Sequence, residues 1–407
     1  MSPATANLMS VDEALSRLIH AAQVVPDDAT RPLNQALGSI LAESPVTGVT
    51  VPPADNSAVD GYALNSRDAA ESSLPVSQRI AAGQFPDPLT RGTAARIFTG
   101  AAIPEGADTV VMQENTELRG AQLILSSFPG ANQNIRPAGQ DIRAGDTLIE
   151  KGTRLQPWHL GLLASAGLPE VRVYRPLRIA VLSSGDELVA PGKALAAGQI
   201  YNSNQIMLQS LVSAAGWEVL PFDTMADTLD ATRHALGLAG DNADAIITTG
   251  GVSVGEEDHI RDAIKSLGTL DLWRMAIKPG KPLAFGTIGN TPILGLPGNP
   301  AAVLVTFLIL ARPFLRCCQG ESGSLSPGAY SVPLGFPVAR AQSRREYQRV
   351  RCRQLEGRQW LEAASNQSSG VLSTACSSDG LAVIPENETR EVGDSVHYYP
   401  FSSLLHG

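Results

Sequence analysis

Residues 177–310 constrain the fold more than any other part of the chain, because short apolar runs and amphipathic segments alternate along them. Ile179-Ala180-Val181-Leu182 is a continuous apolar run, as strands buried on both faces are. Two more strands are predicted at 217–222 and 245–248. Three helices, at 204–215, 228–239 and 258–267, are predicted to alternate with the strands. This alternation favours an open parallel sheet with helices on both faces.

Ala245 to His259, AIITTGGVSVGEEDH, indicates a strand, a glycine turn and a helix start in fifteen residues. Gly250 and Gly251 have no Cβ, so the backbone there can approach a ligand closely. The first N–H groups of the following helix favour an anion at the turn. The carboxylates at 256–258 then suit a divalent cation that bridges to this anion, although taken alone they fit a solvated acidic first turn equally well.

Four other strand ends in this stretch are also polar, acidic or glycine-bearing. They are Ser183-Ser184-Gly185-Asp186-Glu187, the region of Asp223 and Asp227, Ala276-Ile277-Lys278-Pro279-Gly280-Lys281, and Leu296-Pro297-Gly298-Asn299-Pro300. Asn299 suits a helix N-cap and Pro300 the first helical position, which predicts a second anion site. Ligands of open α/β sheets bind beyond the carboxyl ends of the strands, so we expect a site for an anionic ligand at this edge.

The rest of the chain predicts three further parts. A capping box at Ser10–Glu13 opens a helix, a second helix is expected over 33–42, and a third at 158–168 is expected to rejoin them. Short strands between 76 and 128 indicate a small β domain, and GESGSLSPGAY at 320–330 resembles a linker. The predicted domains are 1–44 plus 143–176 (helical/crossover), 45–142 (inserted, β-rich), 177–326 (α/β) and 327–407 (C-terminal, β).

In the last domain Arg349, Arg351 and Arg353 alternate, so they share one face of a predicted strand. A solvated basic edge and an anion contact explain this pattern equally well. The four cysteines form no C-x-x-C pair and have no histidine at zinc-ligand spacing. Soft-metal chemistry would therefore need sulfur ligands from the substrate.

The bulk composition limits the function classes. A length of 407 residues suits roughly two to four domains. The net charge of −9 argues against a nucleic-acid surface, although a local site can still bind an anion. The longest apolar run, 301–311, is shorter than the about 20 residues that cross a membrane, and no signal core opens the chain. We therefore expect a cytoplasmic protein with no membrane or nucleic-acid partner.

Seven segments, spread in the same order over nearly the whole chain, resemble the signature segments of the MoeA family, the molybdopterin molybdenumtransferases related to the E domain of gephyrin. These segments are NSAVDGYA (56–63), IFTGAAIPEGAD (97–108), RPAGQDI (136–142), SSGDEL (183–188), TTGGVSVGEEDH (248–259), AIKPGKP (276–282) and GLPGNP (295–300). The resemblance implies an elongated homodimer of four-domain subunits, multidomain α/β plus β, with a three-layer α/β/α domain that binds molybdopterin. It also implies insertion of molybdate into adenylylated molybdopterin, with Mg²⁺ and release of AMP.

The site residues follow from the strand ends together with this resemblance. The expected catalytic residues are Asp60, Thr99, Asp141, Glu187, Asp227 and Asp258, and Glu187 and Asp258 would hold magnesium. The expected substrate-binding residues are Arg136, Ser184, Gly250, Gly251, Ser253, Lys278, Lys281, Pro297, Gly298, Asn299, Pro300, Arg349 and Ser369. Asp60 and Asp141 come from another domain and would close the site, either within one chain or in trans across the dimer. Arg274 stands where the family often has lysine, and a planar guanidinium does not replace an ammonium group directly.

Two other functions fit parts of the pattern. One is the adenylyltransferase that makes the adenylylated pterin, which resembles the TTGG domain but is usually a single small domain. The other is a non-enzymatic scaffold like the gephyrin E domain. The resemblance also implies transient contacts with the adenylyltransferase and with molybdoenzyme maturation factors.

Overall fold

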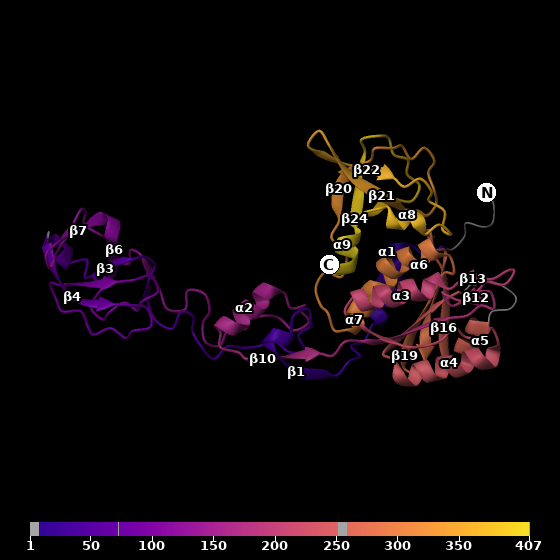
Figure 1. The fold of residues 1–407 in the computed structure, drawn as a ribbon, viewed down its shortest axis with the longest axis horizontal. Coiled ribbons are helices and arrows are strands. Elements are labelled where there is room, and N and C mark those ends of the chain that lie inside the picture. The colour runs from indigo at the N-terminus through magenta and orange to yellow at the C-terminus, as the bar shows by residue number, and fades with distance from the viewer. Residues whose placement is uncertain (1–7, 72, 251–258, 407) are drawn as a thin grey trace.

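The computed structural model describes residues 8–71, 73–250 and 259–406, which form an elongated molecule (Figure 1). A sheet-and-helix body and the C-terminal strands lie at one end, and a separate β sheet lies at the other. A thin middle part, with helix α2 and strands β1 and β10, connects them. The expected glycine-turn residues Gly251, Ser253 and Asp258 lie outside the described residues.

The body is built on a six-stranded sheet in the order β14-β11-β15-β19-β18-β16. Its strands are Glu218–Leu220, Arg178–Ser183, Ala245–Thr249, Thr291–Leu296, Pro282–Ile288 and Gly268–Arg274. β14, β11, β15 and β19 are parallel, but β18 is antiparallel to both of its neighbours, so the sheet is mixed rather than all parallel. Only Gly289 and Asn290 separate β18 from β19, a link that is too short for a parallel crossover.

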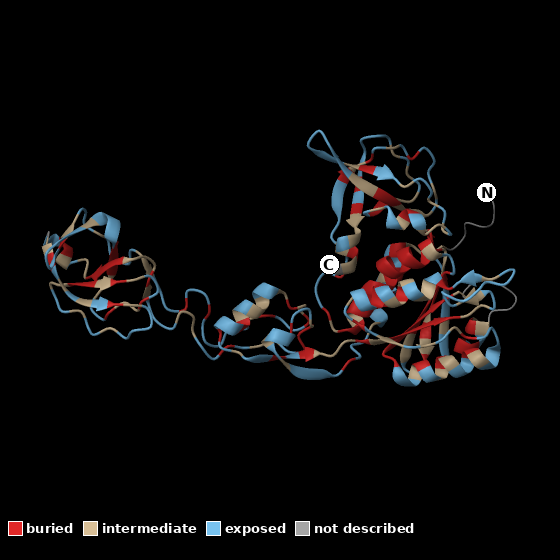
Figure 2. Cartoon of the chain, viewed as in Figure 1, coloured by how far each residue is buried: buried red, intermediate tan, exposed pale blue. Residues whose placement is uncertain are grey.

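Helices cover both faces of this sheet, as the alternation predicts. Ile179 and Val181 pack with α3 (Ser203–Ala214) and the helix that follows β19. Ala180 and Leu182 pack on the opposite face with α4 (Leu229–Asn242) and α5 (His259–Leu267). Neighbouring residues of a strand point to opposite faces, so β11 must be apolar throughout to serve two cores. Figure 2 shows the resulting buried centre of the body.

The helix after β19 is the longest apolar element and lies in the core. It comprises α6 (Pro300–Thr306), a π-helical segment (Phe307–Ala311) and α7 (Arg312–Cys318), so it extends beyond the apolar run at 301–311. Pro313 lacks the N–H that would bond back to Ile309, and the wider π turn just before it accommodates that loss. By length and composition the 19 residues could cross a membrane, but 94% of the most apolar window is buried inside the protein. We therefore interpret it as a core helix.

The N-terminal helix α1 (Val11–Ala21) belongs to the same core. Ser10 caps it by accepting a hydrogen bond from the Glu13 N–H at 3.1 Å, and its buried residues pack against α7. Helix α2 (Pro157–Ser165) instead packs on the segment around Leu41. The helix at 158–168 is expected from sequence to pack with both N-terminal segments. It packs with the 33–42 segment, as expected, but the expectation is wrong for α1.

The helix expected over 33–42 is wrong. Only a single 3₁₀ turn forms, η2 (Leu33–Gln35). Gly38 has φ +75°, and the N–H groups of Gly38 and Leu41 donate to the carbonyls of Leu155 and Thr153 rather than within a helix. Long-range pairing with the 153–155 segment outweighs the local helical periodicity.

The middle part and the distant sheet are joined by extended chain. β1 (Asp28–Pro32) pairs antiparallel with β10 (Glu170–Tyr174) and leads away from the body. The distant sheet has the order β6-β3-β5-β4-β8-β7. Its strands are Thr109–Met112, Gly61–Leu64, Ala94–Ile97, Ser73–Ile80, Gln122–Leu125 and Thr116–Arg119. It has its own buried clusters around Leu64 and Ile97, which accounts for a separate domain.

The C-terminal sheet is attached to the body through a short strand from the segment between β16 and β18. Its order is β17-β21-β23-β24-β20, and β22 pairs with β21. The strands are Ile277–Lys278, Arg345–Leu355, Gly380–Ile384, Ser395–Pro400, Tyr330–Pro333 and Arg358–Ala363. β17 follows the body strand β16 directly in the chain, so this pairing fixes the C-terminal sheet to the edge of the body. Two short helices, α8 (Ser373–Cys376) and α9 (Phe401–His406), complete this part.

A buried ion network joins the body to the middle part. Glu321 accepts two hydrogen bonds from Arg316, at 2.6 and 2.9 Å, and two from Arg154 of the middle part, at 2.8 and 3.4 Å. The Glu321 side chain is 5% exposed, so the start of the predicted linker is anchored in the interior. Burial raises the pKa of Glu321, but the bonds from Arg316 and Arg154 outweigh it, and the net pKa lies below the usual value.

We predict that Glu321→Gln destabilises the protein by about 3 kcal/mol, because the buried Arg316 and the partly buried Arg154 lose their counter-charge. Thermal and urea unfolding measure this loss. In the wild type, the free energy of unfolding should fall by the same amount as pH decreases through the lowered pKa of Glu321. The variant has no carboxylate at this position, so its stability should not show this decrease.

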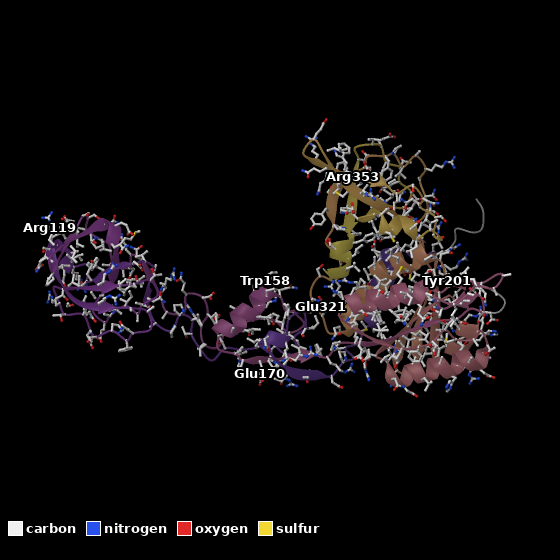
Figure 3. All side chains as sticks on the ribbon, viewed as in Figure 1. Arg119, Trp158, Glu170, Tyr201, Glu321 and Arg353 are labelled. Carbon is white, nitrogen blue, oxygen red and sulfur yellow. The ribbon has the colours of Figure 1, made fainter. Side chains whose placement is uncertain are left out.

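Glu117→Gln is the matched control. Glu117 pairs with Arg119 at the far end of the molecule, where Figure 3 labels Arg119, and the two side chains are 59% and 69% exposed. The loss there should be much smaller than for Glu321→Gln, because water solvates and screens an exposed pair. Equal effects of the two substitutions would contradict a structural role of the buried network.

Candidate active site

The carboxyl ends of three parallel strands are held level with one another. Ser183 of β11 lies opposite Thr249 of β15, and Thr249 lies opposite Leu296 of β19. The turns that follow therefore meet at one edge of the sheet. A Cβ added to Gly250 would lie 3.5 Å from the Ser184 carbonyl oxygen, and one added to Gly298 would lie 3.8 Å from the Gly250 Cα. The convergence of these strand ends, predicted from sequence, is confirmed.

Gly250 has a backbone conformation at this edge that excludes most other residues. Its φ is +82°, in the left-handed region. It ends β15 and turns the chain toward the Gly298 backbone of the neighbouring strand end. Neither glycine adds a side chain where the two strand ends approach each other, so a ligand can contact the backbone there.

Asn204, at the start of α3, ties this edge together. Its Nδ2 donates to the Gly298 carbonyl at 2.7 Å and to Thr249 Oγ1 at 3.1 Å. Thr249 Oγ1 in turn donates to the Pro297 carbonyl at 3.1 Å. The buried Oδ1 of Asn204 has no hydrogen-bond partner among the described residues. The sequence predicts only a helix start at Asn204, and no local pattern marks its two distant partners.

The acidic side of the edge is organised around the turn after β11. Ser184 Oγ donates to Asp227 Oδ1 at 2.9 Å, and Asp186 Oδ1 accepts from the Asp227 N–H at 3.3 Å. The Glu187 carboxylate folds back over the turn, with Oε2 2.6 Å from the position of a Cβ on Gly185. Ser184, Asp227 and Glu187 are therefore neighbours at one strand end. Asp186 is the member of this group that the predicted set lacked.

The lysine-bearing loop between β16 and β18 reaches the same edge of the sheet. β16 ends at Arg274 opposite Pro282, where β18 begins, so Lys278 and Lys281 lie between these two ends. Gly280 packs so closely on α6 that a Cβ there would lie 2.5 Å from Thr306 Cγ2, and its φ is +112°. Lys278 forms an ion pair with the buried carboxylate of Glu346 on β21. Glu346 was not predicted, because it lies 68 positions from Lys278 in the sequence.

The second anion site predicted at the start of α6 is not available as proposed. Pro300 has no N–H, and the Ala301 N–H donates to the Ser369 carbonyl at 3.0 Å. The Asn299 side chain donates to Ser369 Oγ at 3.0 Å instead of capping the helix. A turn of the C-terminal part therefore occupies the donor that an anion would use, and Ser369 lies beside Asn299 and Pro300.

Arg349 stabilises that turn through hydrogen bonds to its carbonyl groups. It is 1% exposed, and its guanidinium donates to the carbonyls of Asn366 and Ser368 at 3.0 Å and to that of Val371. Burial lowers its pKa. Neither a solvated basic edge nor an anion contact describes this residue, because the carbonyls of its own domain surround it. The exposed Arg353 on the same strand pairs with Glu362 at 3.3 Å.

Asp60, Thr99, Arg136 and Asp141 form a separate group in the distant domain. Asp60 Oδ1 accepts from the Thr99 N–H at 2.8 Å and from Thr99 Oγ1 at 2.7 Å. These two bonds lower the pKa of Asp60. Arg136 lies opposite Asn56 in a short antiparallel pair, and the Asp141 N–H donates to the Val51 carbonyl at 3.1 Å. The side chains of Thr99, Arg136 and Asp141 are exposed.

The predicted residues thus fall into two groups at opposite ends of one chain. Figure 1 places the sheet that carries β3 and β6 far from the body, with α2, β1 and β10 between them. The strand-end group of the body and the Asp60 group are therefore not brought together within a single molecule. Within residues 8–71, 73–250 and 259–406, no three His, Cys, Asp or Glu side chains gather closely enough to hold a metal ion.

Comparison with known proteins agrees with this architecture. Residues 9–167 match the family profile "MoeA N-terminal region (domain I and II)", 180–317 match "Probable molybdopterin binding domain", and 331–401 match "MoeA C-terminal region (domain IV)". The chain is 36% identical over 403 residues to the molybdopterin molybdenumtransferase of Haemophilus influenzae, covering 98% of this chain and 100% of that protein. It is 37% identical over 366 residues to that of Nostoc sp., covering 87% and 84%.

Solved structures give the same result. The molybdopterin biosynthesis MoeA protein of Pyrococcus horikoshii is 26% identical, with a TM-score of 0.83 over 97% of this chain and 100% of that chain. A second crystal structure of this Pyrococcus protein is 30% identical, with a TM-score of 0.78 over 97% and 99%. The similarity therefore extends over all parts of the molecule and not only over the α/β body.

We predict that Asn204→Ala destabilises the protein by about 1–3 kcal/mol, because the Gly298 carbonyl and Thr249 lose a buried donor. Hydrogen exchange should increase at residues 297–299 in particular. Asn242→Ala, which removes an exposed amide bonded to the Leu238 carbonyl, is the control and should leave that exchange unchanged. Unaltered exchange at 297–299 in the Asn204 variant would show that the edge is held by other contacts.

Proposed function

The chain belongs to the MoeA family and is a transferase of molybdenum cofactor biosynthesis, and we propose that it inserts molybdate into adenylylated molybdopterin with release of AMP. The observation that supports this most is the convergence of Ser184, Gly250 and Gly298 at one edge. An edge of glycine backbone between carboxylates and lysines suits two anionic reactants, the phosphoanhydride and molybdate. The substrate supplies the dithiolene sulfurs, so no cysteine of the protein is needed.

Lys278 and Lys281 would bind the phosphate or the oxyanion. An ammonium group has three donors, so Lys278 can bind an anion while one donor remains with Glu346. That pairing also restricts the position of the ammonium group, and a positioned cation stabilises developing negative charge better than a mobile one. Gly250 and Gly298 would let the backbone approach the same anion, with Pro297, Asn299 and Pro300 forming the neighbouring turn.

The donor set at this edge fits a magnesium ion, because magnesium prefers oxygen ligands and often takes one or two carboxylates together with substrate phosphates. Glu187 would hold it, since its carboxylate already lies over the Gly185 turn, together with Asp258. When bound, the ion would offset the charge of the phosphoanhydride. Asp227, held by Ser184, would orient the substrate beside it.

Asp60, Thr99, Arg136 and Asp141 would complete the site from a second subunit. Their domain lies at the other end of the molecule, so they cannot reach the strand ends of their own chain without a large rearrangement. A two-fold dimer with antiparallel subunits would place each distant domain over the body of its partner. The Asp60 carboxylate, kept ionised by Thr99, could then accept a proton or orient a ligand group. We further propose that the dimer is cytoplasmic and meets the adenylyltransferase and maturation factors transiently.

The direct test is AMP release. Adenylylated molybdopterin, magnesium and molybdate should yield AMP, and omission of molybdate should abolish it. We predict that Lys278→Met lowers the rate on the order of a hundredfold, because one positioned donor to developing charge is lost. Lys265→Met, on the exposed side of α5, is the control and should keep the wild-type rate. Pyrophosphate release from ATP and molybdopterin without molybdate would instead favour the adenylyltransferase.

Mixed dimers test the contribution in trans. Asp60→Asn and Lys278→Met should each inactivate a homodimer. When the two variants are unfolded and refolded together, a mixed dimer has one site with both defects and one site with neither. About a quarter of the wild-type activity should therefore return, since half of the dimers are mixed and each has one intact site. If Asp60 acted within its own chain, every site would carry a defect and no activity would return.

A further inference from the structure

A cavity beside the strand ends has no role in the proposal above. Its volume is 710 Å³, within the roughly 300–1,000 Å³ of small-molecule sites. Gly185 and Asp186, which follow Ser184 directly, form one wall. Strand β12 (Leu188–Val189), which pairs with β13 (Ile200–Tyr201), and helix α3 form others. Figure 3 labels Tyr201 at this corner of the body.

Some polar side chains of the cavity already have hydrogen-bond partners within the protein, and others are available to a ligand. Asn202 donates to Gln205 Oε1 at 2.8 Å and to Thr224 Oγ1 at 3.1 Å, and Gln205 Nε2 donates to the Phe222 carbonyl at 2.7 Å. These bonds make a rigid floor. Asp223 and Gln209 also line the cavity, and among the described residues no hydrogen bond or ion pair engages either side chain.

The apolar groups suit the faces of a flat ring. Leu188, Val189 and Ile206 line the cavity, and Ile206 is 53% exposed although it lies on a helix that packs into the core. An exposed aliphatic side chain next to free polar groups is typical of a site for a heteroaromatic ligand, with apolar faces and a polar edge.

The carboxylate of Asp223 indicates which heteroaromatic ring the cavity would bind. A carboxylate only accepts, so it matches an edge with two adjacent N–H donors. A pterin presents such an edge through its 2-amino group and N3–H. Adenine presents one donor beside one acceptor, which a carboxamide matches better than a carboxylate. We infer that this cavity binds the pterin ring, with Asp223 accepting both N–H groups, and that the phosphate extends from it to the edge at Ser184 and Gly250. The inference rests on the proposed function.

Binding of 6-hydroxymethylpterin, followed by its fluorescence, tests the inference without turnover. Asp223→Asn replaces one acceptor oxygen by a donor, so the affinity for this pterin should fall about tenfold or more. The affinity for AMP should stay within about twofold, because adenine is bound elsewhere. Asp271→Asn, an exposed carboxylate on β16, is the matched control and should change neither affinity. Equal melting temperatures would show that the variants are folded.

The outcomes separate this inference from the proposed function. Wild-type protein that releases AMP but fails to bind the pterin, or an Asp223→Asn variant that binds it as well as the wild type, would overturn the pterin site and leave the reaction intact. Loss of AMP affinity in that variant would assign the cavity to adenine and also overturn it. Pterin binding that depends on Asp223, in a protein that releases no AMP, would support the site and contradict the proposed reaction.

Discussion

The in-register pairing of β11, β15 and β19 is the constraint on which the rest of the structure depends. Backbone hydrogen bonds hold Ser183, Thr249 and Leu296 level, so the turns after them must share one edge. Since β15 is buried on both faces, a one-residue slip of its register would exchange its side chains between the two cores and separate Gly250 from Ser184 and Gly298. The two cores that require apolar strands therefore also align the site.

A second constraint is the length of the molecule. The distant sheet has its own core, and the body is completed by α1 and the C-terminal strands, so neither end needs the other to bury its apolar residues. The body and the middle part meet at the buried Arg316–Glu321–Arg154 network. A charged network of this kind has strict geometry, because each guanidinium must face its carboxylate. It can therefore hold the direction of the extended part, which a mainly apolar contact would define less well.

Sequence reasoning predicted the elements with strong local signals. The apolar run at 179–182, the Ser10 cap and the glycine turn at 250 lie where the pattern placed them. It was wrong where distant partners determine the structure: the 33–42 segment pairs with 153–155, and the Ala301 N–H at the start of α6 donates to the Ser369 carbonyl. Asn204 and Glu346 were missed for the same reason, since their partners are remote in the chain. The domain boundaries and the roles of the site residues stay predictions.

The arrangement around Ser369 changes how the C-terminal part can contribute. Arg349 is enclosed by carbonyls of the 366–371 turn, and that turn presents Ser369 to Asn299 and Ala301. Glu346, on the same strand as Arg349, holds Lys278. One strand, β21, therefore orients both a lysine and a turn of the strand-end edge. Four of the five guanidinium N–H donors of Arg349 bond to groups of its own domain, so its effect on the edge is to fix the position of other groups.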